Sequence, residues 1–147
     1  MKTRKQQGFS LIEIMVVVVI MGLLAAAIGP TVLGALGQAQ EKVVQSDFKS
    51  IETALKMYKL DNFVYPTSDQ GIEALVAPPE SDPIPRNWRR DGYLPELPQD
   101  PWGNDYLYIS PSEGKPYDIY TLGADGVRGG VEDAADVSNW DKPGDHN

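Results

Sequence analysis

The sequence predicts an α+β protein in which one long N-terminal helix, transmembrane in its first half, packs in its second half on a small antiparallel sheet. Three patterns carry this prediction. Residues 9–28 form an apolar run, residues 44–58 are amphipathic with a helical period, and residues 105–122 contain two short alternating segments. With 147 residues, the chain is long enough for one modest domain in addition to a membrane segment.

The N-terminus begins with a short basic leader, residues 1–8 (MKTRKQQG). The apolar run that follows supplies the length of about 20 residues that the hydrocarbon core of a bilayer requires. Because basic residues precede the run, the N-terminus is expected to stay on the cytoplasmic side. This segment can be interpreted as an ordinary secretory signal cut near Ala25-Ala26-Ala27, or as a membrane anchor that is retained. The apolar region of a secretory signal is typically about 7–15 residues long, so the longer run favours retention.

Glu13 is the only charged side chain in residues 9–36. A carboxylate in a helix that enters lipid costs roughly 2.5–3.5 kcal/mol at the centre of the span and less near an interface, so a partner is expected. Cleavage after Gly8 would free an α-amine on Phe9, and in a polymer the amine of one copy would meet the carboxylate of the next. The alternative is that Glu13 lies at the headgroup level without a specific role.

The second part of the long helix has one apolar face, and it is expected to end near residues 61–62, where turn residues begin. The face has spacings of four and three residues and consists of Val44, Phe48, Ile51, Leu55 and Tyr58. A short helix is predicted over residues 70–76. Residues 78–101 contain seven prolines and predict a long irregular loop. Its expected anchors are Trp88, Tyr93 and Leu94, and its Arg89-Arg90 pair is either solvated or binds an anion.

Two strands are predicted over residues 105–110 and 117–122, joined as a hairpin. Their apolar face is expected to pack on the stripe of the long helix. The last segment, residues 123–147, is rich in Gly and Asp and reads as a loop.

Composition excludes several functions. The net charge is −8, and removing the three basic residues of the leader leaves 10 basic and 21 acidic residues, a net charge of −11, which argues against nucleic acid as a partner. The chain has no Cys, which excludes disulfides, thiolate metal sites and a Cys nucleophile. Its one histidine, His146, lies next to the C-terminus and argues against a Ser-His-Asp triad or a zinc site with several histidines.

Five carboxylates crowd the 17 residues from 125 to 141: Asp125, Glu132, Asp133, Asp136 and Asp141. Carboxylates and loop carbonyls at flexible spacing suit a hard cation such as calcium, although the spacing of an EF-hand is absent. From the residues alone, a solvated acidic loop and a cation site both remain open.

The run Gly8-Phe9-Ser10-Leu11-Ile12-Glu13 after a basic leader resembles the class III signal of type IV pilins and pseudopilins. Further segments resemble the major pseudopilins of type II secretion systems, so that the resemblance covers essentially the whole chain. These segments are Tyr58-Lys59-Leu60-Asp61-Asn62, Tyr65-Pro66, Gly71-Ile72-Glu73-Ala74-Leu75, Asp100-Pro101-Trp102-Gly103-Asn104 and Leu122-Gly123-Ala124-Asp125-Gly126.

The resemblance implies a type IV pilin-like fold and a structural, non-enzymatic role. It implies that a prepilin peptidase cleaves between Gly8 and Phe9 and methylates the amine of Phe9. The subunits would then polymerise helically from the bacterial inner membrane into a periplasmic pseudopilus, with an assembly platform, an ATPase, minor pseudopilins and an outer-membrane secretin as partners. The implied domains are a leader (1–8), a transmembrane and polymerisation helix (9–30) and a periplasmic head (31–147), which includes a variable loop (78–101) and an acidic loop (122–141).

The resemblance also implies calcium in the acidic loop. The side-chain ligands would be Asp125, Asp136 and Ser138, and the carbonyls of Leu122 and Val127 would complete the site. Glu132 or Asp133 could take the place of Val127.

Two other functions compete with the pseudopilin. One is a surface type IV pilin, but many pilins close the C-terminal region with a disulfide, and this chain has no Cys. The other is a membrane-anchored periplasmic enzyme. Paired carboxylates for glycoside hydrolysis are compatible with the sequence, but five acids in one Gly-rich loop fit an ion better.

Overall fold

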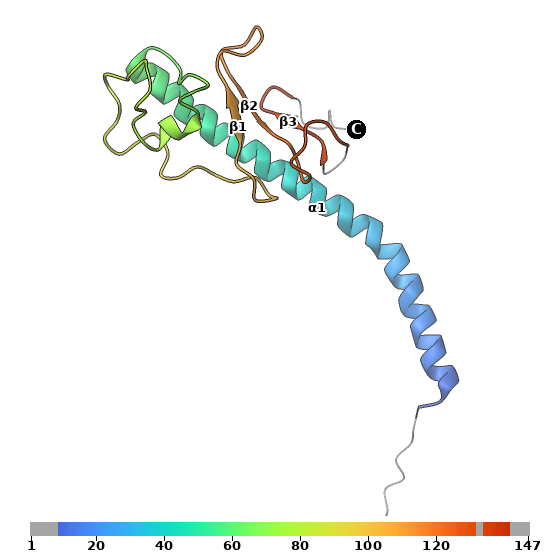
Figure 1. Ribbon diagram of the computed structural model, residues 1–147. Coiled ribbons are helices and arrows are strands. Elements are labelled where there is room, and N and C mark those ends of the chain that lie inside the picture. Colours follow the sequence, from blue (N-terminus) through green and yellow to red (C-terminus); the bar gives the residue numbers. More distant parts are fainter. Residues whose placement is uncertain (1–8, 132–133, 142–147) are drawn as a thin grey trace, which may run out of the picture. The chain divides into compact units, whose positions relative to one another are not determined.

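The computed structural model describes residues 9–131 and 134–141 (Figure 1). Along the chain come helix α1 (Leu11–Asn62), a short 3-10 helix (Ile72–Leu75) and the strands β1 (Leu107–Ile109), β2 (Asp118–Thr121) and β3 (Val137–Ser138). The chain divides into two compact units, one ending at Gln38 and the other, called the head below, beginning at Ala39. Helix α1 contributes to both units.

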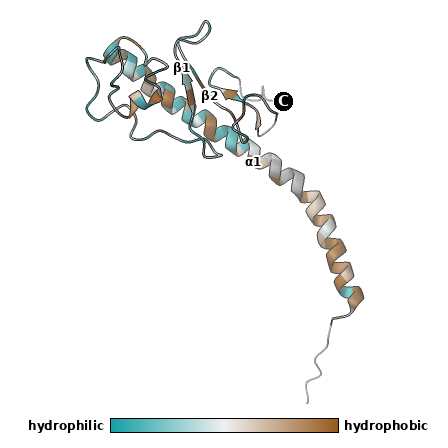
Figure 2. Ribbon diagram, in the orientation of Figure 1, coloured by the Kyte–Doolittle hydropathy of each residue, from teal (hydrophilic) through white to brown (hydrophobic). Residues whose placement is uncertain are grey.

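The first unit contains the apolar part of α1. Residues Leu11–Ile28 are long and apolar enough to cross a membrane, and all of their side chains are exposed in the isolated chain. Figure 2 shows hydrophobic residues along almost all of this part of the helix. The helix begins with the Ser10 carbonyl accepting the N–H groups of Glu13 (3.0 Å) and Ile14 (3.3 Å).

In the head, the predicted apolar face of α1 is confirmed. All five residues of the stripe are at most 2% exposed, namely Val44, Phe48, Ile51, Leu55 and Tyr58. The helix ends at Asn62, as predicted, and Phe63 follows it in the left-handed region with φ of 65°. A bulky residue rarely adopts this conformation, so Phe63 marks a forced change of chain direction.

The hairpin is also confirmed, and the sheet has a third strand. The strands are antiparallel in the order β1-β2-β3, with Tyr108 opposite Ile119 and Thr121 opposite Val137. The prediction of a loop throughout residues 123–147 is therefore wrong at β3. A strand of two residues is too short to show the alternation by which strands are recognised in a sequence.

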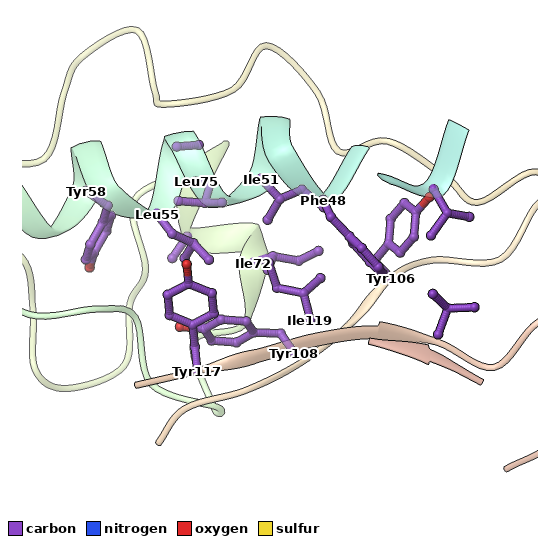
Figure 3. Close-up of a cluster of buried hydrophobic side chains, with 14 residues drawn as sticks. Phe48, Ile51, Leu55, Tyr58, Ile72, Leu75, Tyr106, Tyr108, Tyr117 and Ile119 are labelled. Atoms are coloured by element: carbon purple, nitrogen blue, oxygen red, sulfur yellow. The ribbon is translucent and has the colours of Figure 1, made fainter. Parts of the chain in front are cut away.

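The core lies between the helical stripe and the sheet (Figure 3). The tyrosine face of β1 points inward, since Tyr106 and Tyr108 are buried, while Leu107 is 38% exposed. The hydroxyl of Tyr106 donates to Asp47 (2.8 Å) and that of Tyr108 to the Pro66 carbonyl (2.9 Å), so both rings are buried without a loss of hydrogen bonding. Burial raises the pKa of Tyr108 to about 12.

The short helix predicted over residues 70–76 is a 3-10 helix of four residues, Ile72–Leu75. Gly71, with φ of 64°, precedes it in a conformation that an α-helix does not allow, and prolines at 78 and 79 follow it. Only a short helix fits between these two breaks. Its residues Ile72 and Leu75 are buried in the core, as their apolar character indicated.

The proline-rich loop is held by the anchors that the sequence predicted. The indole of Trp88 donates to the Ala74 carbonyl (2.8 Å), and the backbone N–H groups of Tyr93 and Leu94 donate to Leu75 (2.7 and 3.1 Å). Arg89 forms an ion pair with Asp61 at the end of α1 (2.5 Å), so its guanidinium fastens the loop to the helix. This hydrogen bond from Arg89 lowers the pKa of the Asp61 carboxyl.

Candidate assembly segment and cation-binding loop

Glu13 lies in the first turn of α1 and is exposed in the isolated chain. Within residues 9–131 and 134–141, the ion pairs are Lys56–Glu52 and Arg89–Asp61, so Glu13 takes part in neither. Phe9 is also exposed, at 78%. Gly8, which precedes the expected cleavage, lies outside the described residues.

The acidic loop starts with tight turns at the end of β2. Gly123 and Gly126 have φ of 66° and 64°, which a residue with a side chain rarely adopts. Between them, Asp125 Oδ1 accepts a hydrogen bond from the backbone N–H of Val127 (3.0 Å). Such a bond from the N–H two residues later to an Asp side chain defines an Asx turn. This bond holds the Asp125 carboxylate next to the backbone of Val127.

A buried aspartate outside the loop supports its first turn. Asp100 is 4% exposed, and it accepts the Thr121 hydroxyl (2.6 Å) and the backbone N–H of Asn104 (2.8 Å). The amide of Asn104 in turn donates to the Gly123 carbonyl (3.3 Å). The sequence indicated Asp100 only as the end of the proline-rich loop and as part of a segment that resembles the pseudopilins. Its combination with Pro, Trp, Gly and Asn was the one signal that could have marked it as structural.

Asp136 has one satisfied and one unsatisfied carboxylate oxygen. Its Oδ2 accepts the N–H of Gly129 (3.0 Å), whereas its Oδ1 is buried and has no hydrogen-bond partner in the part of the chain that the structure describes. Buried carboxylate oxygens normally have a partner, so an unpaired one indicates a place for an unseen cation or water.

Ser138, on β3, contacts two further aspartates. Its hydroxyl donates to Asp118 Oδ1 (2.6 Å), and its backbone N–H donates to Asp141 (2.6 Å). A hollow of about 250 Å³ is lined by these residues together with Asp136 and Arg128, whose guanidinium lies 6.0 Å from the centre of the Tyr120 ring. Asp118 is thus a neighbour of the candidate site, although it lies outside the acidic loop of the sequence.

The structure therefore brings together two of the five expected ligands, Asp136 and Ser138. Asp125, Val127 and Leu122 do not line this hollow, and the alternative ligands Glu132 and Asp133 lie outside the described residues, as does His146. In the described ranges, no group of three or more Asp, Glu or His side chains is arranged to hold a metal. The available donors are all oxygens, and together with the unpaired Asp136 Oδ1 they fit a hard cation in their chemistry.

Comparison with known proteins agrees with the fold and the N-terminal pattern. The family described as type II secretion system (T2SS), protein G, matches residues 31–140, and the prokaryotic N-terminal methylation motif matches residues 3–29. The chain belongs to the type II secretion protein G family. The earlier resemblance to the major pseudopilins is thereby confirmed.

Its relatives match over nearly their full length. The chain is 55% identical to the type II secretion system core protein G of Pseudomonas aeruginosa, which covers 96% of this chain and 99% of that one. It is 54% identical to the protein of the same name from Vibrio cholerae, over 95% and 94% of the two chains. The crystal structure of the major pseudopilin from the type 2 secretion system of enterohaemorrhagic Escherichia coli has 46% identity and a TM-score of 0.67, and the match covers 74% of this chain and 92% of that one.

These matches favour the secretion pseudopilin over the type IV pilus pilin and the periplasmic enzyme. They support a membrane-anchored structural subunit of a secretion machinery made of several kinds of subunit. The expected roles of Gly8, Phe9 and Glu13, the domain boundaries and the calcium ligands stay predictions.

Proposed function

We propose that this chain is the major structural subunit of a type II secretion pseudopilus, which polymerises from the inner membrane and helps to export folded proteins through the outer-membrane secretin. The observation that carries this proposal is the apolar segment Leu11–Ile28, whose side chains are all exposed in a chain of the protein G family. Lipid covers such a segment before assembly, and neighbouring copies cover it in a filament.

Processing prepares the segment for assembly. A prepilin peptidase cleaves between Gly8 and Phe9 and methylates the new amine on Phe9. The match to the N-terminal methylation motif supports this step. The amine of one subunit then pairs with Glu13 of the next, because two opposite charges in a medium of low dielectric are far better paired than alone.

The head faces the periplasm and the leader the cytoplasm, with residues 9–30 in the inner membrane. The partners are other copies of the chain, the prepilin peptidase, minor pseudopilins, the assembly platform with its ATPase, and the secretin. The role is structural rather than enzymatic, and the acidic composition fits no nucleic-acid partner.

Calcium binds the acidic loop in this proposal. Asp125, Asp136 and Ser138 supply side-chain oxygens, and Leu122 and Val127 supply carbonyls. The unpaired Asp136 Oδ1 supports a cation here, and the bond from the Val127 N–H to Asp125 supports grouping these two residues. An ion that binds only the folded head would stabilise it by mass action, in a chain that has no disulfide to hold the loop.

The function is tested by deleting the gene in its own bacterium. Proteins exported by the type II system are expected to disappear from the medium and to accumulate in the periplasm, and the wild-type gene on a plasmid is expected to restore their export. Undiminished export without the chain would contradict the proposal.

Calcium binding is tested by thermal unfolding of the full chain in detergent. Adding a chelator is expected to lower the melting temperature of the wild type, and Asp125→Ala is expected to abolish this sensitivity. Asp91→Ala removes an aspartate from an exposed position in another loop, and the melting temperature of this control should still fall when chelator is added. A wild-type melting temperature that does not respond to chelator and calcium would refute the site.

A further inference from the structure

The hydrogen bond between Ser138 and Asp118 links the acidic loop to the sheet. Ser138 stands opposite Tyr120 in the ladder between β2 and β3, and Asp118 lies two residues before Tyr120 on the same face of β2. Residues at such diagonal positions are close enough for their side chains to meet. Here the serine hydroxyl donates to Asp118 Oδ1 at 2.6 Å, a short bond to a charged acceptor and therefore a strong one.

This bond determines where the hydroxyl proton of Ser138 points. A serine hydroxyl has one proton to donate and two lone pairs that accept. The proton goes to Asp118, and the backbone N–H of Trp140 donates to one lone pair of the serine oxygen (3.3 Å). A hydroxyl that coordinates a cation must direct a lone pair, and not its proton, at the ion. Because the proton is directed at Asp118, the hydroxyl of Ser138 keeps a lone pair that can coordinate an ion.

Asp118 is well placed to impose this orientation. It is paired with Ile109 in the register of β1 and β2, so its backbone is held by the sheet. The hollow that it lines with Ser138 also contains Asp136, the residue with the unpaired buried oxygen. A hydrogen-bond partner behind a ligand commonly orients that ligand and tunes its affinity for the metal.

We propose that Asp118 is a positioning residue of the cation site, which acts by holding the hydroxyl of Ser138 with its lone pair toward the ion. This inference rests on the calcium site proposed above. It assigns a role to a residue of β2 that lies outside the acidic loop and is not one of the expected ligands. Asp118 acts through Ser138, so its effect on calcium depends on the serine.

The test is a calcium titration by calorimetry on the full chain in detergent after treatment with chelator. Asp118→Ala is expected to weaken calcium binding roughly 10–100-fold, the usual range for a partner behind a metal ligand. Asp118→Asn keeps an oxygen that accepts the serine proton, and it should weaken binding clearly less. Asp91→Ala, an exposed aspartate in another loop, is the control for the loss of one negative charge.

A double-mutant cycle separates positioning from other roles. If Asp118 acts through Ser138, the two losses of affinity should not add. The variant with both Asp118→Ala and Ser138→Ala should then bind calcium as tightly as whichever single variant has the lower affinity. If the factors by which the two substitutions lower calcium affinity multiply in the double variant, the inference is overturned, since Asp118 then acts on the ion independently. An equal loss in Asp118→Asn and Asp118→Ala would also overturn it, because charge rather than the hydrogen bond would be responsible.

The outcomes also separate this inference from the site on which it rests. Calcium binding by the wild type with no change in Asp118→Ala would refute the role of Asp118 and leave the site standing. A wild type that binds no calcium would refute both. Circular dichroism in chelator checks that each variant is folded. If Asp118→Ala fails to fold, Asp118→Asn is compared with Ser138→Ala, and an equal loss of calcium affinity in these two variants would overturn the inference.

Discussion

Helix α1 contains two apolar segments that differ in what covers them. Over residues 44–58, the apolar side chains form one stripe, and the stripe is buried by the sheet and the 3-10 helix of the same chain. Over Leu11–Ile28, apolar side chains occur on all sides and all are exposed. A helix that is apolar all round needs a surrounding apolar medium, whereas a single stripe needs one packed surface. The head therefore buries its own core, whereas the N-terminal segment needs an apolar surrounding that its own chain does not supply.

The largest effect is expected at the N-terminal segment, from Glu13→Ala. The variant should still insert into the membrane, because removing a charge makes insertion easier, but it should assemble poorly since the amine of Phe9 would lose its partner. Filament formation in membranes and export of proteins to the medium are the measurements. Ser10→Ala, an exposed polar position in the same segment, is the control and should assemble normally. Normal filaments from Glu13→Ala would remove the charge-pairing argument.

A cavity in the head should have a large effect that the N-terminal segment does not share. Leu55 is fully buried, and Leu55→Ala is expected to lower the free energy of unfolding of the head by about 2–5 kcal/mol. Leu24→Ala makes the same change at a side chain that is 56% exposed, and it should leave unfolding of the head unchanged. Urea unfolding in detergent, followed by tryptophan fluorescence, gives both values. Similar losses in the two variants would contradict the separation of the segments.

The buried contact between Thr121 and Asp100 should have a smaller effect. Thr121→Val leaves a buried carboxylate short of one donor, and it should destabilise the head by about 1–3 kcal/mol. Thr53→Val removes an exposed hydroxyl from α1 and should change stability by less than about 0.5 kcal/mol. The same urea experiment measures both. Equal effects would show that Asp100 does not depend on the threonine hydroxyl.

The smallest effect is expected at the ion pair between Asp61 and Arg89, and it appears as a pH dependence. The hydrogen bond from Arg89 lowers the pKa of Asp61 below its ordinary value of 3.8. The pair therefore stabilises the head above that pH, and its contribution is lost as the pH falls further through the lowered pKa. Asp61→Asn should flatten the fall in melting temperature over this acidic range. An unchanged acid profile would show that the ion pair does not help to hold the loop on the helix.

The parts of the fold that were predictable have a repeating pattern. The stripe of α1 has the helical period over five residues, and residues 105–110 and 117–122 alternate as strands do. The motif around Gly8 indicated the family because a short basic leader, an apolar run and a single acid occur together. The anchors of the proline-rich loop were recognisable as isolated large apolar residues.

The parts that were missed depend on contacts between distant residues. Strand β3 has two residues and no pattern of its own, and it exists because β2 offers a free edge. Asp118 and Ser138 are 20 residues apart, and Asp100 and Thr121 are 21 apart, so neither pair leaves a local signal. The apolar face of β1 was expected to pack on the helix, and this prediction is wrong, since Leu107 is exposed and the tyrosine face is buried. A tyrosine can be buried where its hydroxyl finds a partner, as Tyr106 does at Asp47.

The intact mass of the mature protein extracted from membranes tests whether the apolar segment is retained. An N-terminal segment that is retained for assembly predicts a chain that begins at Phe9 and carries a methyl group on its amine. A chain that begins at Ile28 would mean that the apolar segment is an ordinary signal peptide, and the proposed filament subunit would be contradicted.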